Sequence, residues 1–140
     1  MAKQSVCLNW VDHLAFETEL NGHKLILDAD SSVGGLNRGP KPKSLMLVAL
    51  AGCTGMDVIS ILQKMRVDIK EFSVRVEGEL TEEHPKHYTK MKVIYEFAGK
   101  DIPMDKLQKA VTLSEEKYCG VRAVYSKTME VTSEIILKEG

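Results

Sequence analysis

The chain has few cysteines, few aromatic residues and almost no net charge. Its 140 residues include 3 cysteines and 6% aromatic residues, and the formal net charge is -1. An odd cysteine count without CxxC spacing argues against the disulfide framework of a secreted protein and against a four-ligand structural zinc site. Balanced charge without a basic run offers no attraction for nucleic acid or an anionic membrane surface. We therefore expect neither as a partner.

Signals for export and for a second domain are also missing. The first ten residues, MAKQSVCLNW, lack the apolar core and cleavage site of a signal peptide. The window from Lys43 to Lys64 is long enough to span a bilayer, but its polar residues, Asp57 among them, favour a helix buried by protein. No repeat or linker divides the chain. We expect a cytoplasmic protein with a single domain over residues 1–140.

The first third of the chain predicts three strands and a loop. Residues 5–11 and 14–20 are typical of strands, and the turn signal Asn21-Gly22 leads to a third at 23–29. Glycine and proline then break the segment 31–42. Residues 45–65 are apolar on most sides, which predicts a helix buried all round. In so short a chain, a dimer is one way to bury such a helix.

The rest of the chain predicts two long strands, a helix and a last strand. Residues 72–80 and 90–97 alternate apolar and polar side chains, so an antiparallel pair is expected. Apolar spacing predicts a helix over 103–119, and residues 129–137 predict a strand. The order β-β-β-α-β-β-α-β indicates an α+β domain with antiparallel sheets around the long buried helix.

Two cysteines are candidates for chemistry. Cys53 lies in the apolar helix between Gly52 and Gly55, and Cys119 ends the second helix. If they meet, a thiolate could cleave a peroxide and the resulting sulfenic acid could condense with the second thiol. Free cysteine is also among the most buried residue types, and spacing alone favours two inert core residues. Cys7, alone on a predicted strand, is assigned to the inert class.

Two motifs resemble those of the OsmC/Ohr family of thiol-dependent peroxidases. They are GPKPKSLMLVALAGCTGMDVISIL, around Cys53, and SEEKYCGVRAVY, around Cys119. The resemblance covers nearly the whole chain and implies an OsmC-like fold and an intertwined homodimer. It implies reduction of organic hydroperoxides with Cys53 as peroxidatic and Cys119 as resolving residue. A small dithiol, often a lipoyl group, would be the reductant, without metal or flavin cofactor.

The chain departs from the family pattern at two places. The family's peroxidases carry a glutamate ten positions before the first cysteine, where this chain has Lys43, and Cys119 is followed by Gly120 instead of proline. Arg38, in the loop before the helix, is the best candidate for stabilising a thiolate, with Lys43 as an alternative source of positive charge. A solvated loop charge is about as well supported for Arg38, and a lysine at a helix start, such as Lys43, is more often exposed.

Other polar residues have two interpretations each. Asp57, one turn after Cys53, would oppose thiol ionisation. Glu115 or Glu116 could orient an arginine, although SEEK usually marks a solvated helix face. His84 and His87 could bind metal with Cys or Asp, although a solvated loop is the commoner case. The alternative function is a weakly catalytic or non-catalytic dimer that holds an apolar small molecule in an interfacial pocket.

Overall fold

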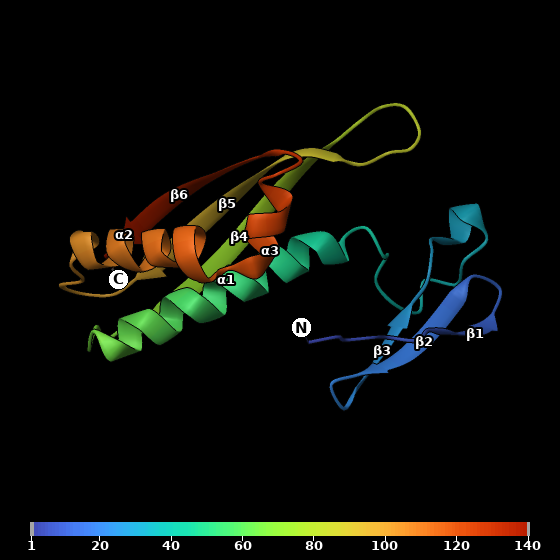
Figure 1. Cartoon of the computed structure of the whole chain (residues 1–140), viewed down its shortest axis with the longest axis horizontal. Helices are drawn as coiled ribbons and strands as arrows, with labels where there is room; N and C mark the ends of the chain where they lie inside the picture. The colour runs from blue at the N-terminus through green and yellow to red at the C-terminus, as the bar shows by residue number, and fades with distance from the viewer. Residues whose placement is uncertain (1, 140) are drawn as a thin grey trace. The chain divides into compact units, whose positions relative to one another are not determined.

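The computed structural model describes residues 2–139 and divides into two compact units, one reaching Met46 and the other beginning at Leu47 (Figure 1). Within the described residues, each unit contains one three-stranded sheet, and the second also contains the long helix. This mixture confirms the predicted α+β class. Because the two units are separate compact bodies, each is described by itself.

The N-terminal unit is a meander of three short strands. These are β1 (Asn9–Asp12), β2 (Ala15–Leu20) and β3 (His23–Leu27), paired antiparallel in sequence order. Asn21 and Gly22 both have positive φ angles, 52° and 83°. Two positive φ angles in a two-residue turn match the twist of the flanking strands, so the predicted hairpin is confirmed. A short 3-10 helix, η1 (Ser31–Val33), follows.

The C-terminal unit is built on a long helix and a second sheet. Its elements are α1 (Leu45–Lys64), β4 (Glu71–Leu80), β5 (Tyr88–Ala98), α2 (Met104–Leu113), the π-helical turn η2 (Ser114–Tyr118), α3 (Gly120–Tyr125) and β6 (Glu130–Lys138). The sheet order is β4-β5-β6, and β4 and β5 pair antiparallel as predicted.

One strand pair differs from the predicted antiparallel arrangement. β6 runs parallel to β5, with Tyr95 opposite Ile135. Parallel strands need a long crossover, and here α2, η2 and α3 supply it, returning the chain to the end of the sheet where β5 began. The sequence showed the strand but not its direction, because alternation is the same in both directions.

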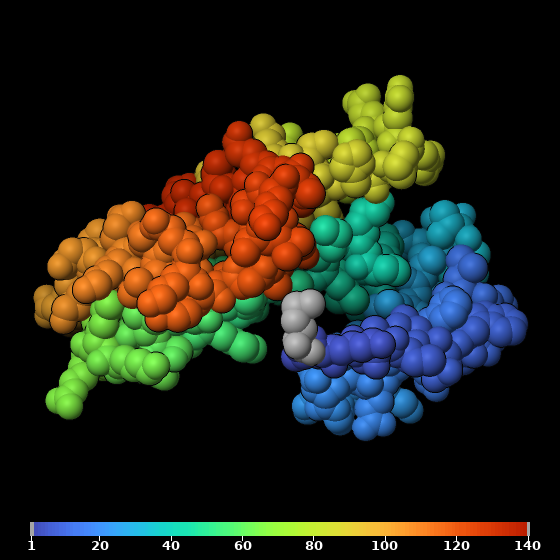
Figure 2. Space-filling view, viewed as in Figure 1, coloured from blue at the N-terminus to red at the C-terminus, as the bar shows by residue number. Residues whose placement is uncertain are grey.

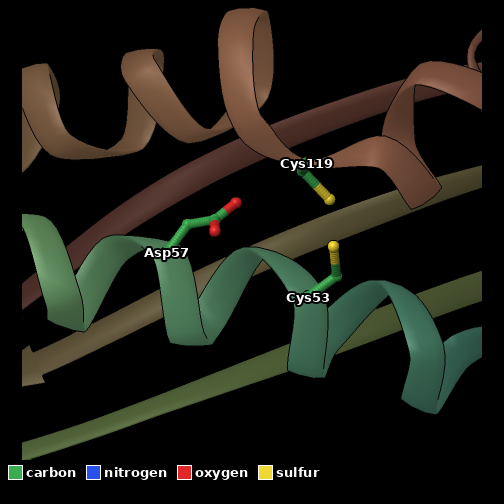
Figure 3. A group of neighbouring side chains, drawn as sticks. All are labelled: Cys53, Asp57 and Cys119. Atoms are coloured by element: carbon green, nitrogen blue, oxygen red, sulfur yellow. The ribbon is translucent and has the colours of Figure 1, made fainter.

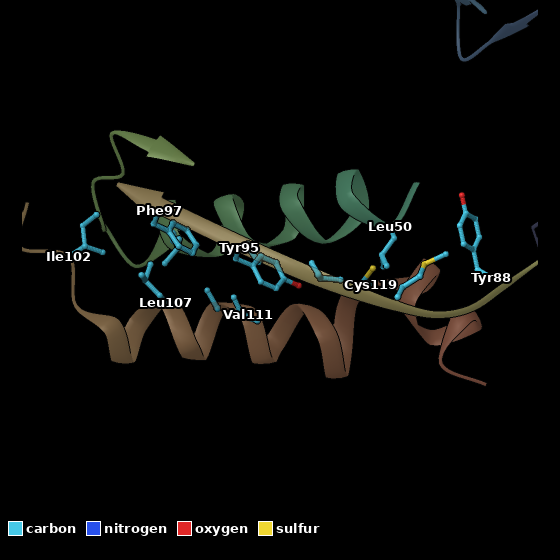
Figure 4. Packing of buried hydrophobic residues seen from close by; sticks show 13 residues of the cluster. Leu50, Tyr88, Tyr95, Phe97, Ile102, Leu107, Val111 and Cys119 are labelled. Carbon is cyan, nitrogen blue, oxygen red and sulfur yellow. The ribbon is translucent and has the colours of Figure 1, made fainter. Parts of the chain in front are cut away.

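The core of this unit lies between the sheet and the helices (Figure 4). The predicted inward face of β5 is fully or almost fully buried, and the Phe97 ring stacks on Phe72 with centroids 4.4 Å apart. Leu107, Ala110 and Val111 cover it from α2. In Figure 2 the orange surface of α2 lies directly against the green C-terminal half of α1. These contacts fix the relative positions of α1 and the crossover that carries Cys119.

Within the single chain, the long helix is buried along one stripe only, and burial of its other faces by a second copy stays a prediction. Leu50, Thr54, Val58 and Leu62, each four residues apart, are its buried residues. Met56, by contrast, is 74% exposed. By length and composition alone α1 could cross a membrane, but core helices of soluble proteins meet the same criterion. In the single chain, an apolar face of α1 is therefore exposed.

Candidate functional site

The structure brings Cys53 and Cys119 together. Cys53 is in the middle of α1, and Cys119 stands at the junction of η2 and α3 (Figure 3). Their two sulfurs and a carboxylate oxygen of Asp57 all lie within 4.8 Å of one another. Cys53 is half-buried, Cys119 is buried, and Cys7 is exposed in the N-terminal unit. Cys53 and Cys119, which the sequence predicted as a pair, are thus spatial neighbours although they are far apart in the chain.

A break in the helix at η2 aims the Cys119 side chain. The five residues of η2 form one wide π-helical turn, which the Cys119 N–H closes by donating to the Ser114 carbonyl at 2.7 Å. The Cys119 backbone is then extended, with φ -78° and ψ 98°. Its sulfur caps α3 by accepting a hydrogen bond from the Arg122 N–H at 3.4 Å. Turns of this kind often occur at functional sites.

Burial raises the pKa of the Cys119 thiol to about 11. The hydrogen bond from the Arg122 N–H lowers this pKa, whereas neighbouring Cys53 and the Asp57 carboxylate raise it. Cys119 is therefore protonated near neutral pH, which does not suit the first nucleophile of a thiol reaction. Cys53 is the more exposed residue of the two.

The two glycines beside Cys53 have different surroundings. A Cβ added at Gly55 would meet the Val74 side chain at 3.3 Å, tighter than ordinary contact, so close packing of α1 on β4 explains this glycine. A Cβ added at Gly52 meets nothing within 4 Å in the chain. The packing explanation therefore holds for Gly55 and not for Gly52.

A chain of buried hydroxyl groups starts at Asp57. The Ser114 hydroxyl donates to the Asp57 carboxylate at 3.0 Å, and its oxygen lies 2.8 Å from the Thr54 oxygen. Thr54 in turn lies 2.8 Å from the Tyr95 hydroxyl. All three hydroxyl residues are fully buried. Burial raises the pKa of Tyr95 far above its usual range, although the hydrogen bond with Thr54 lowers it. Tyr95 thus remains a neutral donor.

The chain of hydroxyls ends at an ion pair beneath Cys119. Tyr95 donates to the Glu115 carboxylate at 3.0 Å, and Arg122 donates to the same oxygen at 3.0 Å. A second guanidinium nitrogen of Arg122 donates to the Val131 carbonyl on β6 at 3.0 Å. One of the two glutamates considered for this role, Glu115, therefore does hold an arginine. The arginine is Arg122, which the sequence did not single out; its only signal is a spacing of about two helical turns from Glu115.

Arg38 occupies a different environment, in the N-terminal unit. Its Nε donates to the Asp28 carboxylate at 3.1 Å, and its Nη2 binds Asp12. Burial alone would raise the pKa of Asp28, but the hydrogen bonds from the Ala29 N–H and Arg38 hold it at about 2. Arg38 thereby ties its loop to β1 and to the end of β3. Lys43 is exposed. A role for Arg38 at the thiolate stays a prediction.

A pocket of about 460 Å³ opens beside Asp57, between α1 and the α2–η2 segment. Apolar residues and two lysines, Lys64 and Lys109, line it together with Tyr118. The carboxylate that faces the two sulfurs therefore also borders open space. His84 and His87 lie on the exposed β4–β5 connection, and among residues 2–139 they join no group able to hold a metal ion.

Comparison with known proteins identifies the family to which this chain belongs. A family model described as OsmC-like protein matches residues 34–134, a span that includes both cysteines. The chain belongs to the OsmC-like family. Protein YhfA of Escherichia coli K12 is 34% identical to it over 126 residues, which is 89% of this chain and 91% of YhfA. That similarity extends through most of both proteins.

Solved structures of OsmC-like and related proteins share the fold. A hypothetical protein from Aquifex aeolicus superimposes with a TM-score of 0.86 at 28% identity, covering 100% of this chain and 99% of that one. The organic hydroperoxide resistance protein OsmC from Legionella pneumophila gives a TM-score of 0.69 at 14% identity, covering 97% and 99%. At that identity the second match shows the fold alone. The predicted OsmC-like fold is confirmed.

Proposed function

We propose that this OsmC-like protein reduces organic hydroperoxides, with Cys53 as the peroxidatic and Cys119 as the resolving thiol. The observation that carries the proposal is that the two sulfurs face each other from α1 and the η2–α3 junction, within 4.8 Å (Figure 3). Related proteins named for organic hydroperoxide resistance have the same fold, which is compatible with this assignment. The proposed compartment is the cytoplasm, where thiols stay reduced.

The reaction has three balanced steps. The Cys53 sulfur attacks the terminal oxygen of the hydroperoxide, the O–O bond breaks, and an alcohol leaves as Cys53 becomes a sulfenic acid. The Cys119 thiol then attacks that sulfur, releasing water and forming a Cys53–Cys119 disulfide. A small dithiol, of the lipoyl type, reduces this disulfide by exchange and becomes a cyclic disulfide itself.

The exposure of the two sulfurs fits this division of labour. The half-buried Cys53 is the sulfur that a substrate could reach, whereas buried Cys119, with a pKa of about 11, is kept as a thiol until its neighbour is oxidised. The pocket beside Asp57 offers space for the organic part of a hydroperoxide. No added cofactor is needed, because the electrons come from the two thiols.

A homodimer is part of the proposal. The α1–β4 groove, about 560 Å³ in volume, is an apolar hollow over the exposed side of α1. Its lining residues are Ala51, Gly52, Gly55, Met56, Ile59, Ile69, Lys70, Phe72 and Val74. Large exposed apolar surfaces mark interaction sites, and the same face on a second copy is the partner proposed here. Gly52 would give that copy room for close approach.

An alternative function is binding of an apolar small molecule without turnover. Apolar side chains of Ile61, Met65 and Leu113 in the pocket beside Asp57 favour it, as does Lys43 at the position of the family glutamate. On this alternative, a long-chain alcohol would raise the thermal stability of the protein equally in the wild type and in Cys53→Ser. Hydroperoxide consumption would be negligible in both.

Consumption of cumene hydroperoxide with dihydrolipoamide tests the proposal. We expect turnover by the wild type, loss of turnover in Cys53→Ser, and full turnover in the matched control Cys7→Ser. Cys119→Ser should still reduce one equivalent of hydroperoxide in a single turnover, leaving a sulfenic acid that dimedone traps. Equal turnover by Cys53→Ser, or none by the wild type, would contradict the proposal.

A further inference from the structure

The side chains of Cys53, Asp57 and Cys119 together have the composition of a metal site. Two sulfurs and one carboxylate oxygen converge from α1 and the η2–α3 junction. Thiolate sulfur favours Zn²⁺ over Mg²⁺ and Ca²⁺, and Zn²⁺ accepts carboxylate oxygen as well. Neither histidine of the β4–β5 connection is needed. The spacing of cysteines in the sequence predicted no metal site, because Cys53, Asp57 and Cys119 do not form a local sequence motif.

The distances suit a tetrahedral ion. With Zn–S near 2.3 Å and Zn–O near 2.0–2.2 Å, neighbouring ligand atoms of a tetrahedral site lie about 3.5–3.8 Å apart. The sulfurs of Cys53 and Cys119 and the Asp57 oxygen already lie within 4.8 Å of one another. Small side-chain rotations therefore bring all three to bonding distance of one ion. A fourth position would remain for solvent, which reaches Asp57 through the adjoining pocket.

Hydrogen bonds to two of the three ligands hold them in place. The Ser114 hydroxyl donates to Asp57 at 3.0 Å, and Ser114 is itself fixed by buried Thr54. The Arg122 N–H donates to the Cys119 sulfur at 3.4 Å. Metal sites in proteins are built in this way, with an outer shell of hydrogen bonds that orients the ligands. An isolated surface cluster of acidic residues lacks such a shell.

We propose that the reduced protein binds one Zn²⁺ ion through Cys53, Asp57 and Cys119. Zinc displaces the proton of each thiol as it binds. A disulfide between Cys53 and Cys119 removes both sulfur ligands, so zinc and the oxidised state exclude each other. The proposal does not depend on peroxidase activity, since it requires only the three side chains and their geometry.

Titration of the reduced, metal-free protein with Zn²⁺ and Co²⁺ tests this site. We expect one Zn²⁺ per chain and, with Co²⁺, the intense visible bands of a tetrahedral ion with sulfur-to-metal charge transfer. Zinc-edge X-ray absorption of the wild type should show two sulfur neighbours at about 2.3 Å. This last measurement needs no variant, so it decides the case even where a substitution disturbs folding.

Matched variants identify the ligands. Cys53→Ser, Cys119→Ser and Asp57→Asn should each weaken zinc binding, whereas Cys7→Ser and Asp105→Asn, on α2, should bind as the wild type. Ser114→Ala should lower affinity by roughly 10- to 100-fold, as loss of an outer-shell hydrogen bond does. Oxidation with diamide should abolish binding, and dithiothreitol should restore it.

Three results would overturn the site: no zinc bound by the reduced wild type, fewer than two sulfur neighbours, or unchanged affinity in Asp57→Asn. These outcomes are distinguishable from failure of the proposed function. If the protein binds zinc but does not consume hydroperoxide, the zinc site stands and the proposed peroxidase function fails. If it consumes hydroperoxide but does not bind zinc, the function stands and the zinc site fails.

Discussion

Arg122 and Glu115 form a half-buried ion pair 3.0 Å long that spans the break between η2 and α3. Their side chains are 18% and 13% exposed. Arg122 also reaches the Cys119 sulfur through its backbone N–H and the Val131 carbonyl through its side chain. One residue thus joins the segment that carries Cys119 to the sheet.

Removal of this guanidinium should destabilise the protein. Arg122→Met leaves the half-buried Glu115 carboxylate without its cation, a loss of about 1.5–3 kcal/mol in the free energy of unfolding. The double variant Arg122→Met/Glu115→Gln should recover part of that loss, because no uncompensated charge remains. Urea denaturation measures both, with Arg75→Met, on the exposed side of β4, as the control. Equal midpoints for Arg122→Met and Arg75→Met would contradict the assignment.

Removal of the buried hydroxyl groups of Ser114 and Thr54 should lower the free energy of unfolding by different amounts. Ser114 donates a hydrogen bond directly to the Asp57 carboxylate. Thr54 contacts only two neutral hydroxyl groups, those of Ser114 and Tyr95. The Tyr95 hydroxyl in turn donates to the Glu115 carboxylate. Thr54→Val keeps the shape of the side chain and removes two hydrogen bonds between neutral groups, each worth about 1 kcal/mol. Ser114→Ala should cost more, since a hydrogen bond to a charged group is lost. Thermal unfolding of both variants tests the order.

Asp28 should make the N-terminal unit sensitive to acid. Its carboxylate accepts the N–H groups of Ala29 and Leu36 and the guanidinium of Arg38, and its pKa is lowered from 3.8 to about 2. A lowered folded-state pKa contributes stability above the unfolded-state value, and this contribution is lost as the pH falls from about 4 to about 2.

Amide exchange of residues 28–38 as a function of pH measures this effect. Protection should fall with acidification in the wild type, and the slope should be shallower in Asp28→Asn. Glu19→Gln, on the exposed end of β2, is the matched control and should keep the wild-type slope. A wild-type slope in Asp28→Asn would show that another group causes the acid sensitivity.

A charge placed in the α1–β4 groove should prevent dimerisation. Met56 is 74% exposed in the single chain, so Met56→Glu costs little in the monomer but would bury a carboxylate in the proposed interface. We expect a dimer for the wild type and for Gln108→Glu, on the exposed side of α2, and a monomer for Met56→Glu. Light scattering after size-exclusion chromatography measures the masses. A dimeric Met56→Glu would place the interface elsewhere.

Local sequence patterns predicted most of the elements. Alternation marked β4 and β5, and the Asn21-Gly22 turn set the β2–β3 hairpin, because these signals are read within a few residues. The helix expected over 103–119 is instead α2 followed by η2, and α3 was missed. SEEKY fits an ordinary helix equally well, so only the hydrogen bond from Cys119 to Ser114 distinguishes the wide turn.

The candidate site was predictable in part. Two motifs led to Cys53 and Cys119, which the structure places side by side. Ser114, Tyr95 and Arg122 were not found, because they reach the site from different elements and none belongs to a local motif. Asp57 was noticed as an opponent of thiol ionisation, but its position facing both sulfurs depends on how α1 packs against the crossover.

The wide turn η2 has a consequence for how this family can diverge. Each residue in a helix turns the following side chains by about 100°, so losing or gaining one residue between Ser114 and Tyr118 would point position 119 away from Cys53. Substitutions in this turn leave its length intact, whereas insertions and deletions do not. The length of this five-residue segment should therefore matter more than its composition for keeping Cys119 opposite Cys53.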